Sequence, residues 1–165
     1  MATTSAGDVT LGTRTPVIAM LRRLQSAYVA EFDRRLRSSE FCALSFAHSR
    51  NVLRHLGDGP RRASQLVELA GVTKQAISQQ LSHLEAEGYV LTVPDPADHR
   101  ARLVALTDKG ARAQQLVRQT FVEIEDDWGP ALGGSERVAA FRGDLELILD
   151  VLGEPPEGAV APSRC

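Results

Sequence analysis

One segment, residues 61–107, constrains the fold of this chain more than any other, because helix signals and strand signals follow one another in it without a long linker. A short helical pattern ends at a turn that contains Gly71. A second pattern begins at Thr73 and runs without Gly or Pro as far as Gly88. Thr is a favoured N-cap and Gly a favoured C′ residue, so the sequence predicts a helix over residues 73–87.

The predicted helix 73–87 has one apolar face and one polar face. Ile77, Leu81 and Leu84 fall on one stripe at about 100° per residue, which is the side expected to face a core. The opposite side carries amide, hydroxyl and imidazole groups: Gln75, Ser78, Gln79, Ser82 and His83. Such groups can bond to base edges in a DNA major groove, where a row of carboxylates would be repelled by phosphate. The alternative is an ordinary amphipathic helix with a solvated polar face, and the helix taken alone favours that alternative.

The residues after this helix predict a hairpin. Residues 89–94 and 102–106 have strand patterns, and a loop rich in Pro and Asp, residues 95–102, joins them. A helix-turn-helix followed by a hairpin with Arg at its tip is a winged helix. In such a fold one helix can occupy the major groove while an arginine of the wing reaches the minor groove.

The wing sequence resembles that of the MarR-type transcriptional regulators. Residues 95–110 read Asp-Pro-Ala-Asp-His-Arg-Ala-Arg-Leu-Val-Ala-Leu-Thr-Asp-Lys-Gly, similar to the family's Asp-x-Arg turn and its strand ending Leu-Thr-x-x-Gly. A Leu-Glu-x-x-Gly-Tyr sequence ends the preceding helix, and a looser resemblance in helix pattern extends over residues 16–152. The resemblance implies that Arg100 enters the minor groove and that Asp98 braces it or the wing backbone. A surface ion pair of little energetic value is the alternative.

The chain also departs from the family pattern. Basic side chains that are common in the family are absent at Gln79, at His83 and in the strand at residues 91–93. We therefore expect fewer phosphate contacts and a shallower dependence of DNA binding on salt. His83 also makes pH-sensitive binding conceivable, since the ordinary pKa of His is about 6.5.

Composition limits the classes of function. The net charge is −2, but residues 113–165 carry 4 basic and 10 acidic side chains, so the acidity lies remote from the winged helix. No apolar run is long enough for a membrane span, no secretory signal is evident, and we expect a cytoplasmic protein. No catalytic motif and no His/Cys metal spacing occurs, so we expect neither an enzyme nor a cofactor or metal.

The whole chain is expected to be mainly α with a small antiparallel β-hairpin (α+β). We divide it into a flexible arm (1–15), N-terminal helices (16–56), a winged lobe (57–107), C-terminal helices (108–152) and a disordered tail (153–165). Residues 61–63 are expected to add a short first strand, and residues 45–56 a single helix with Ala47 inward. The expected helix caps are Ser45, Ser64, Thr107 and Ser135.

Long apolar stripes on the helices that flank the lobe predict a homodimer. Helix 16–37 is expected to pack with helix 135–152 of the same and of the partner chain. A two-fold dimer would place two recognition helices about 34–36 Å apart on a pseudo-palindromic operator. The family resemblance also implies a small anionic or phenolic effector that weakens DNA binding. The candidate effector contacts are Tyr28, Phe32, His48 and Arg50, for which core packing or solvation is the alternative.

We thus predict a sequence-specific, double-stranded DNA-binding transcriptional regulator, a repressor released by its effector, with helix 73–87 and wing 94–102 as its reading elements. The candidate DNA contacts are Thr73, Lys74, Gln75, Ser78, Gln79, Ser82, His83, Asp98, Arg100, Arg102, Arg61 and Arg62. One alternative is a redox sensor through Cys42, although its apolar neighbours in sequence favour an inert side chain. The other is a winged-helix module that binds proteins and not DNA.

Overall fold

The computed structural model describes residues 15–153, so the predicted arm and tail lie outside it except for Thr15 and Gly153. The elements in chain order are α1 (Val17–Arg37), α2 (Phe46–Asn51), the 3-10 helix η1 (Leu53–Leu56), α3 (Ala63–Ala70), α4 (Lys74–Ala86), β1 (Val90–Asp95), β2 (Asp98–Leu106), α5 (Asp108–Asp126), α6 (Gly129–Leu132) and α7 (Ser135–Val151). The predicted fold class, mainly helical with one antiparallel hairpin, is confirmed.

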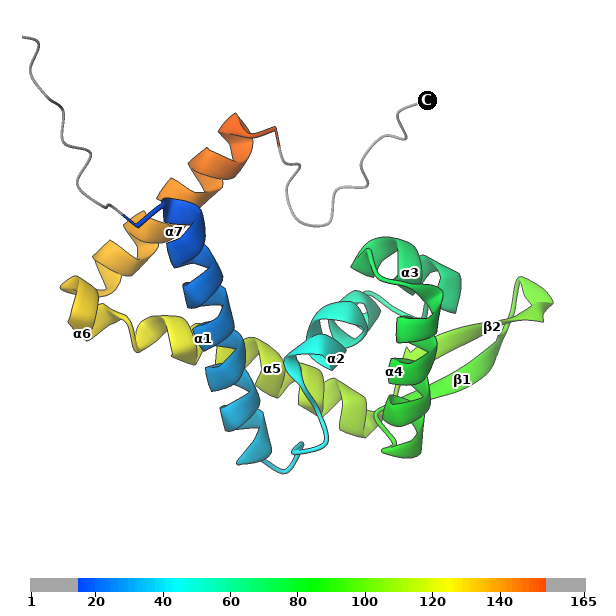
Figure 1. Cartoon of the computed structure of the whole chain (residues 1–165). Helices are drawn as coiled ribbons and strands as arrows, with labels where there is room; N and C mark the ends of the chain where they lie inside the picture. The colour runs from blue at the N-terminus through cyan, green and yellow to red at the C-terminus, as the bar shows by residue number, and fades with distance from the viewer. Residues whose placement is uncertain (1–14, 154–165) are drawn as a thin grey trace, which may run out of the picture.

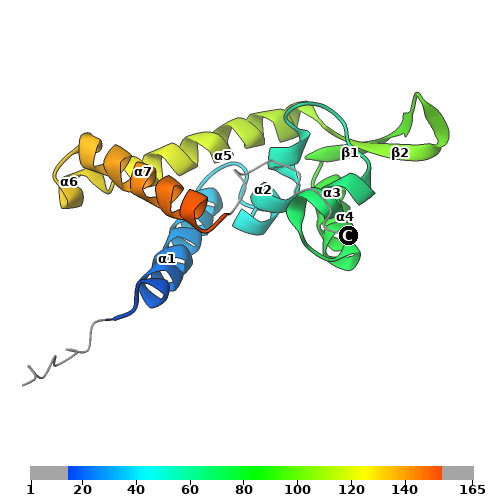
Figure 2. The ribbon, with the colours of Figure 1, turned by 90° about the horizontal axis from the view of Figure 1, so that it is seen from above.

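The elements form two groups (Figure 1). The winged lobe contains α3, α4 and the β1–β2 hairpin, and the scaffold contains α1, α5, α6 and α7. In Figure 2 the long helix α5 runs from the hairpin to α6 and α7, so it belongs to the scaffold but starts at the lobe. In both views the hairpin projects beyond α3 and α4.

The hairpin differs from the predicted long loop. Its strands pair from Val90↔Leu106 to Pro94↔Arg102, and the next pair is Asp95↔Asp98. The turn itself contains only two residues, because the Asp95 carboxylate accepts the Ala97 N–H at 2.9 Å and closes it. The jump in register leaves residues 99–101 as a bulge without partners on β1.

The predicted first strand is reduced to one bridge. Arg61 exchanges two backbone hydrogen bonds with Val104, of 3.0 and 2.8 Å, and pairs with no further residue of β2. The bridge cannot extend, because α3 begins at Ala63 and Arg62 is its N-cap.

Three of the five predicted N-caps are confirmed in full, Thr73, Thr107 and Ser45. The Thr107 hydroxyl accepts the Gly110 N–H, and the Ser45 hydroxyl accepts the His48 N–H. The predictions for Ser64 and Ser135 are wrong: both lie within the first turn of their helices, after the N-caps Arg62 and Gly134.

The predicted helix 45–56 is interrupted. Val52 has φ −127° and ψ −65°, which ends α2, and η1 continues after it. Val52, Leu53 and Leu56 are buried as expected, whereas Ala47 is exposed.

One core joins the lobe to the scaffold. Phe32 and Leu36 of α1 are fully buried, as are Leu66 of α3 and Leu84 of α4. Tyr89, at the start of the hairpin, is also buried, and all five belong to a single cluster with residues of α5. Burial of this area is the main stabilising contribution to the fold.

The outer ends of the scaffold keep large apolar side chains in solvent. No residue of α7 is buried, and Val151 and Leu152 are 87% and 74% exposed. At the start of α1, Val17 and Ile18 are 62% and 66% exposed. These two helix faces have no apolar partner within one described chain. No helix of residues 15–153 combines the length and the apolar character needed to cross a bilayer.

A close approach at Gly110 yields a test of the fold. A Cβ at this position would lie 1.9 Å from the Tyr89 carbonyl oxygen, so Gly110→Ala must displace backbone. We expect a loss of about 2–3 kcal/mol in the free energy of unfolding, measured by urea titration. The matched control is Gly143→Ala in α7, where an added Cβ meets nothing within 4 Å. Alanine there should stabilise by up to about 1 kcal/mol, and equal losses in both variants would contradict the packing described.

Candidate nucleic-acid interface

The exposed face of α4 carries free polar side chains. The Thr73 hydroxyl accepts the Ala76 N–H at 3.1 Å and so starts the helix, while Ile77 and Leu84 are buried on the inner face. Within residues 15–153, the side chains of Lys74, Gln75 and Gln79 make no hydrogen bond or ion pair. The predicted contacts that this face exposes are Thr73, Lys74, Gln75, Ser78, Gln79 and Ser82. Ser82 donates its hydroxyl proton to the Ser78 carbonyl at 3.0 Å, so it can only accept from a ligand in that state.

His83 departs from the predicted polar row. Its Nε2 donates to the Ala43 carbonyl oxygen at 2.8 Å, and its ring stacks on His48 with 4.7 Å between centroids. The side chain is half-buried against α2 and does not lie with the exposed amides. Burial, followed by the adjacent His83, lowers the pKa of His48 below 6.5.

The bulge of β2 exposes Arg100. Within the described residues its guanidinium makes no hydrogen bond or ion pair, and the side chain is free for a ligand. Asp98 braces the backbone and not the guanidinium, because its Oδ1 accepts the Arg100 N–H at 3.1 Å. Arg102 donates to the Thr92 carbonyl across the hairpin at 3.4 Å and is also exposed.

The two arginines at the start of α3 are engaged within the lobe. Arg62 donates from Nη2 and Nε to Asp95 Oδ2 at 2.6 and 3.0 Å, and Asp98 lies 3.6 Å from the same guanidinium. We call these three residues the wing clamp, because they tie α3 to both ends of the turn. The Arg62 guanidinium and the Ala97 N–H hold the pKa of Asp95 below its usual value. Arg61 donates to the His55 carbonyl at 2.5 Å, so both arginines that the sequence predicts as phosphate contacts also bond to other residues of this chain.

A second set of polar contacts joins the lobe to α5. The Thr107 hydroxyl donates to the Gly88 carbonyl at 2.7 Å. Lys109 donates to the Glu87 carbonyl at 2.6 Å, and its ammonium lies 4.2 Å from the Tyr89 ring centroid. These contacts fix the C-terminal end of α4 to the first turn of α5. The Leu-Thr-x-x-Gly sequence is the signal for them, although its pattern alone does not name the partners.

The four candidate effector residues do not form one site. Tyr28 lines a cavity of about 350 Å³ between α1, α5 and α7, together with Trp128, Phe141 and Arg142. Phe32 is fully buried and stacks on Phe121, so its prediction as a ligand contact is wrong. His48 faces His83, and Arg50 is exposed on α2; neither lines the cavity.

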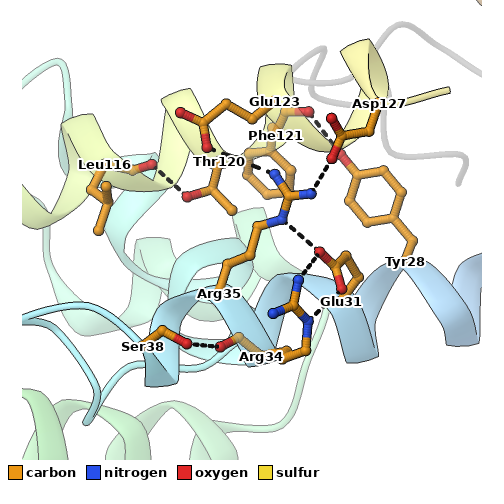
Figure 3. A network of polar contacts seen from close by, with 10 residues as sticks. All are labelled: Tyr28, Glu31, Arg34, Arg35, Ser38, Leu116, Thr120, Phe121, Glu123 and Asp127. Atoms are coloured by element: carbon orange, nitrogen blue, oxygen red, sulfur yellow. Dashed lines mark hydrogen bonds and ion pairs between the residues drawn. The ribbon is translucent and has the colours of Figure 1, made fainter. Parts of the chain in front are cut away.

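Ion pairs beside Tyr28 fix α1 against α5 (Figure 3). Arg35 donates to Glu31 at 2.6 Å and to Asp127 at 2.5 Å, and it lies 3.7 Å from Glu123. Hydrogen bonds from Arg34 and Arg35 lower the pKa of Glu31 to about 2. The Tyr28 hydroxyl donates towards the Phe121 carbonyl and Glu125, at 3.4 and 3.3 Å.

Cys42 is exposed, contrary to the setting expected from its apolar neighbours. The side chains of Phe41 and Leu44 turn into the core instead. No cluster of three or more His, Cys, Asp or Glu that could hold a metal ion occurs in residues 15–153.

Comparison with known proteins shows what this chain resembles. The MarR family model matches residues 45–101, from the cap of α2 into the bulge of β2. The reduced form of MarR from E. coli aligns with a TM-score of 0.73 and 19% identity, covering 84% of this chain and 99% of that one. Transcriptional regulator Tm0710 from Thermotoga maritima is 27% identical, with a TM-score of 0.58 and coverage of 86% and 99%. Streptococcus pneumoniae FabT, solved in complex with DNA, aligns with a TM-score of 0.69 and 21% identity, covering 84% and 96%.

No curated protein sequence matches this chain. The family model covers the lobe, and the solved structures extend the likeness to the scaffold helices. Residues 45–101 therefore resemble the MarR family, and the fold of residues 15–153 is similar to that of the solved MarR structures.

Proposed function

We propose that this protein regulates transcription by binding double-stranded DNA, with α4 in the major groove and the β1–β2 wing in the minor groove. The observation that carries the proposal is the pairing of two free surfaces on one lobe. One is the exposed face of α4, which carries no carboxylate from Lys74 to Ser82, and the other is the guanidinium of Arg100 on the bulge, unpaired within the described residues. FabT, which has the same fold, was solved with DNA.

The chemistry of α4 suits base edges. Gln75 and Gln79 each have a free amide, and an amide can bond to adenine through both its donor and its acceptor. Lys74 adds one positive charge at the N-terminal end, where the helix dipole also favours phosphate. Glu85 and Glu87 lie at the other end of the helix, away from the turns that enter a groove in this fold.

The wing suits a narrow minor groove. An arginine inserted there meets the negative potential of the groove without needing a particular base. Arg100 is the matching side chain, because Arg62 is held by Asp95 and Arg61 by the His55 carbonyl. The small number of free cations on the lobe predicts a shallow dependence of affinity on salt.

Selection of bound duplexes from a random library at fixed salt tests this function and supplies the operator. With the selected duplex, Arg100→Gln should weaken binding roughly tenfold or more, measured by fluorescence anisotropy. The matched control is Arg37→Gln at the end of α1, which removes an exposed charge outside the winged lobe and should change affinity little. Failure to enrich any sequence, or equal losses in the two variants, would favour a protein-binding winged helix instead.

We also propose that the protein acts as a homodimer through α1 and α7. The supporting observation is the set of exposed apolar side chains at the outer ends of both helices, among them Ile18, Leu147 and Leu152 at 66%, 65% and 74% exposure. Large exposed apolar patches usually mark an interface. A two-fold dimer would present two α4 helices to successive major grooves, about 34–36 Å apart.

Charge placed in this face should separate the subunits. Ile148→Glu with Leu152→Glu buries two carboxylates in the proposed interface, so light scattering should fall from twice the 17.9 kDa chain mass to one chain. Val122→Glu is the matched control, because Val122 is 57% exposed on α5 and outside the proposed interface. A monomeric wild type at micromolar concentration would refute the dimer.

The cavity beside Tyr28 favours a second function, release of DNA by a small effector. Its walls come from α1, α5 and α7, so an occupant can change the angle between the proposed dimer helices and the lobes. Aromatic rings of Tyr28, Trp128 and Phe141 line it, and Arg142, paired with Glu125, supplies a cation at its edge. A small phenolic anion matches this lining. In this scheme the DNA-bound dimer represses by blocking polymerase.

Trp128 provides the readout, because it lines the cavity and is the single tryptophan of the chain. We expect 4-hydroxybenzoate to change Trp128 fluorescence saturably and to weaken binding of the selected duplex. Arg142→Gln should weaken both effects, since it removes the cation. An unchanged fluorescence spectrum at millimolar 4-hydroxybenzoate would exclude this ligand class for the cavity.

A further inference from the structure

The contact between α4 and α2 is made by two imidazole rings. His83 of α4 lies nearly parallel to His48 of α2, with an interplanar angle of 16° and 4.7 Å between ring centroids. His83 Nε2 donates to the Ala43 carbonyl at 2.8 Å, so this nitrogen carries a hydrogen. His48 Nδ1 lies 3.1 Å from the Ser45 hydroxyl. The pair therefore ties the proposed recognition helix to the segment that precedes the lobe.

Two unsatisfied acceptors lie one helical turn from this pair. Asn51 follows His48 by three residues on α2, and Gln80 precedes His83 by three on α4, so each shares a face with its histidine. Within residues 15–153, Asn51 Oδ1 and Gln80 Oε1 are buried without a hydrogen-bond partner. A buried acceptor without a donor costs free energy. The polar side chains flanking the pair thus add little to the α2–α4 contact, whose polar part consists of the His48–His83 stack and the His83–Ala43 hydrogen bond.

We propose that the His48–His83 pair is a proton-sensitive contact that holds α4 in its DNA-binding position, and that protonation of His48 beside His83 releases α4 and weakens DNA binding. This inference rests on the function proposed above, and it adds a signal, proton concentration, to the same site.

The physical reason is charge in a confined space. A positive charge on His48 is unfavourable here, because burial removes part of its hydration and the stacked His83 adds repulsion. Charged groups nearby do not reverse this. Asp33 on α1 favours protonation of His48, but its Oδ1 already accepts the Phe46 N–H at 2.7 Å. Glu87 follows His83 by four residues in the chain, and it is not among the charges that shift the pKa of His48.

The direction of the pH effect follows from His48. Burial and His83 outweigh Asp33, so folding lowers the pKa of His48 below 6.5. A histidine with a lowered pKa stabilises the native contact fully above its ordinary pKa. That contribution is lost as the pH falls below about 6.5 and through the lowered value. DNA binding should therefore weaken on mild acidification.

The contact can be tested first without DNA. In the full-length protein, NMR should show the His48 ring titrating below pH 6.5, together with movement of the α4 backbone amides. His48→Phe preserves an aromatic stack but cannot take up a proton, so in this variant the α4 amides should stay unmoved over the same range. His83→Gln keeps a donor for the Ala43 carbonyl and should do the same. Unmoved α4 amides in the wild type would overturn the proposal.

The second arm measures affinity for the selected duplex between pH 7.5 and 5.5 at constant ionic strength. It uses a His99→Gln background, which removes the exposed imidazole of the wing from the comparison. We expect affinity to fall between about three- and tenfold, and His48→Phe to remove most of that fall. An equal fall with and without His48→Phe would overturn the proposal. Absence of binding at pH 7.5 would instead overturn the proposed function, while the NMR arm still decides whether the contact senses protons.

Discussion

The junction at Thr107 and Gly110 sets the geometry on which the rest of this molecule depends. The Thr107 hydroxyl starts α5 and at the same time bonds to the Gly88 carbonyl at the end of α4. Gly110 allows the Tyr89 carbonyl to approach α5 closer than any side chain would permit. Since α5 reaches the far end of the scaffold, this one junction fixes the orientation of the winged lobe relative to α1 and α7.

Two groups of ion pairs position the other elements, one within the scaffold and one within the lobe. The ion pairs of Arg35 with Glu31 and Asp127 hold α1 on α5 within the scaffold. The wing clamp holds the hairpin on α3 within the lobe. Surface pairs contribute little to global stability when taken singly. Their value here is geometric, because each arginine bridges two elements that are distant in sequence. In this molecule, charged side chains mostly orient elements, and apolar burial stabilises them.

Local signals predicted the fold well, and they predicted part of the exposed polar surface of α4. Thr73, Thr107 and Gly88 carry their own backbone preferences, so the helix ends at these residues follow from sequence. Arg62 and His83 could not be assigned in this way, since their partners Asp95 and His48 lie more than thirty residues away and only tertiary packing brings them near. The hairpin was intermediate: its strands followed from pattern, whereas the two-residue turn required the Asp95–Ala97 hydrogen bond.

The bulge at residues 99–101 separates two mechanical roles within the wing. Paired residues on both sides keep the hairpin stiff, but these three residues form no ladder bonds with β1. The Arg100 side chain can therefore change its orientation without breaking the hydrogen bonds that pair β1 with β2. Minor grooves vary in width with base sequence, and a loosely tethered guanidinium can settle into grooves of different widths. The amide face of α4 would then discriminate between operators, while the wing would accept minor grooves of different widths.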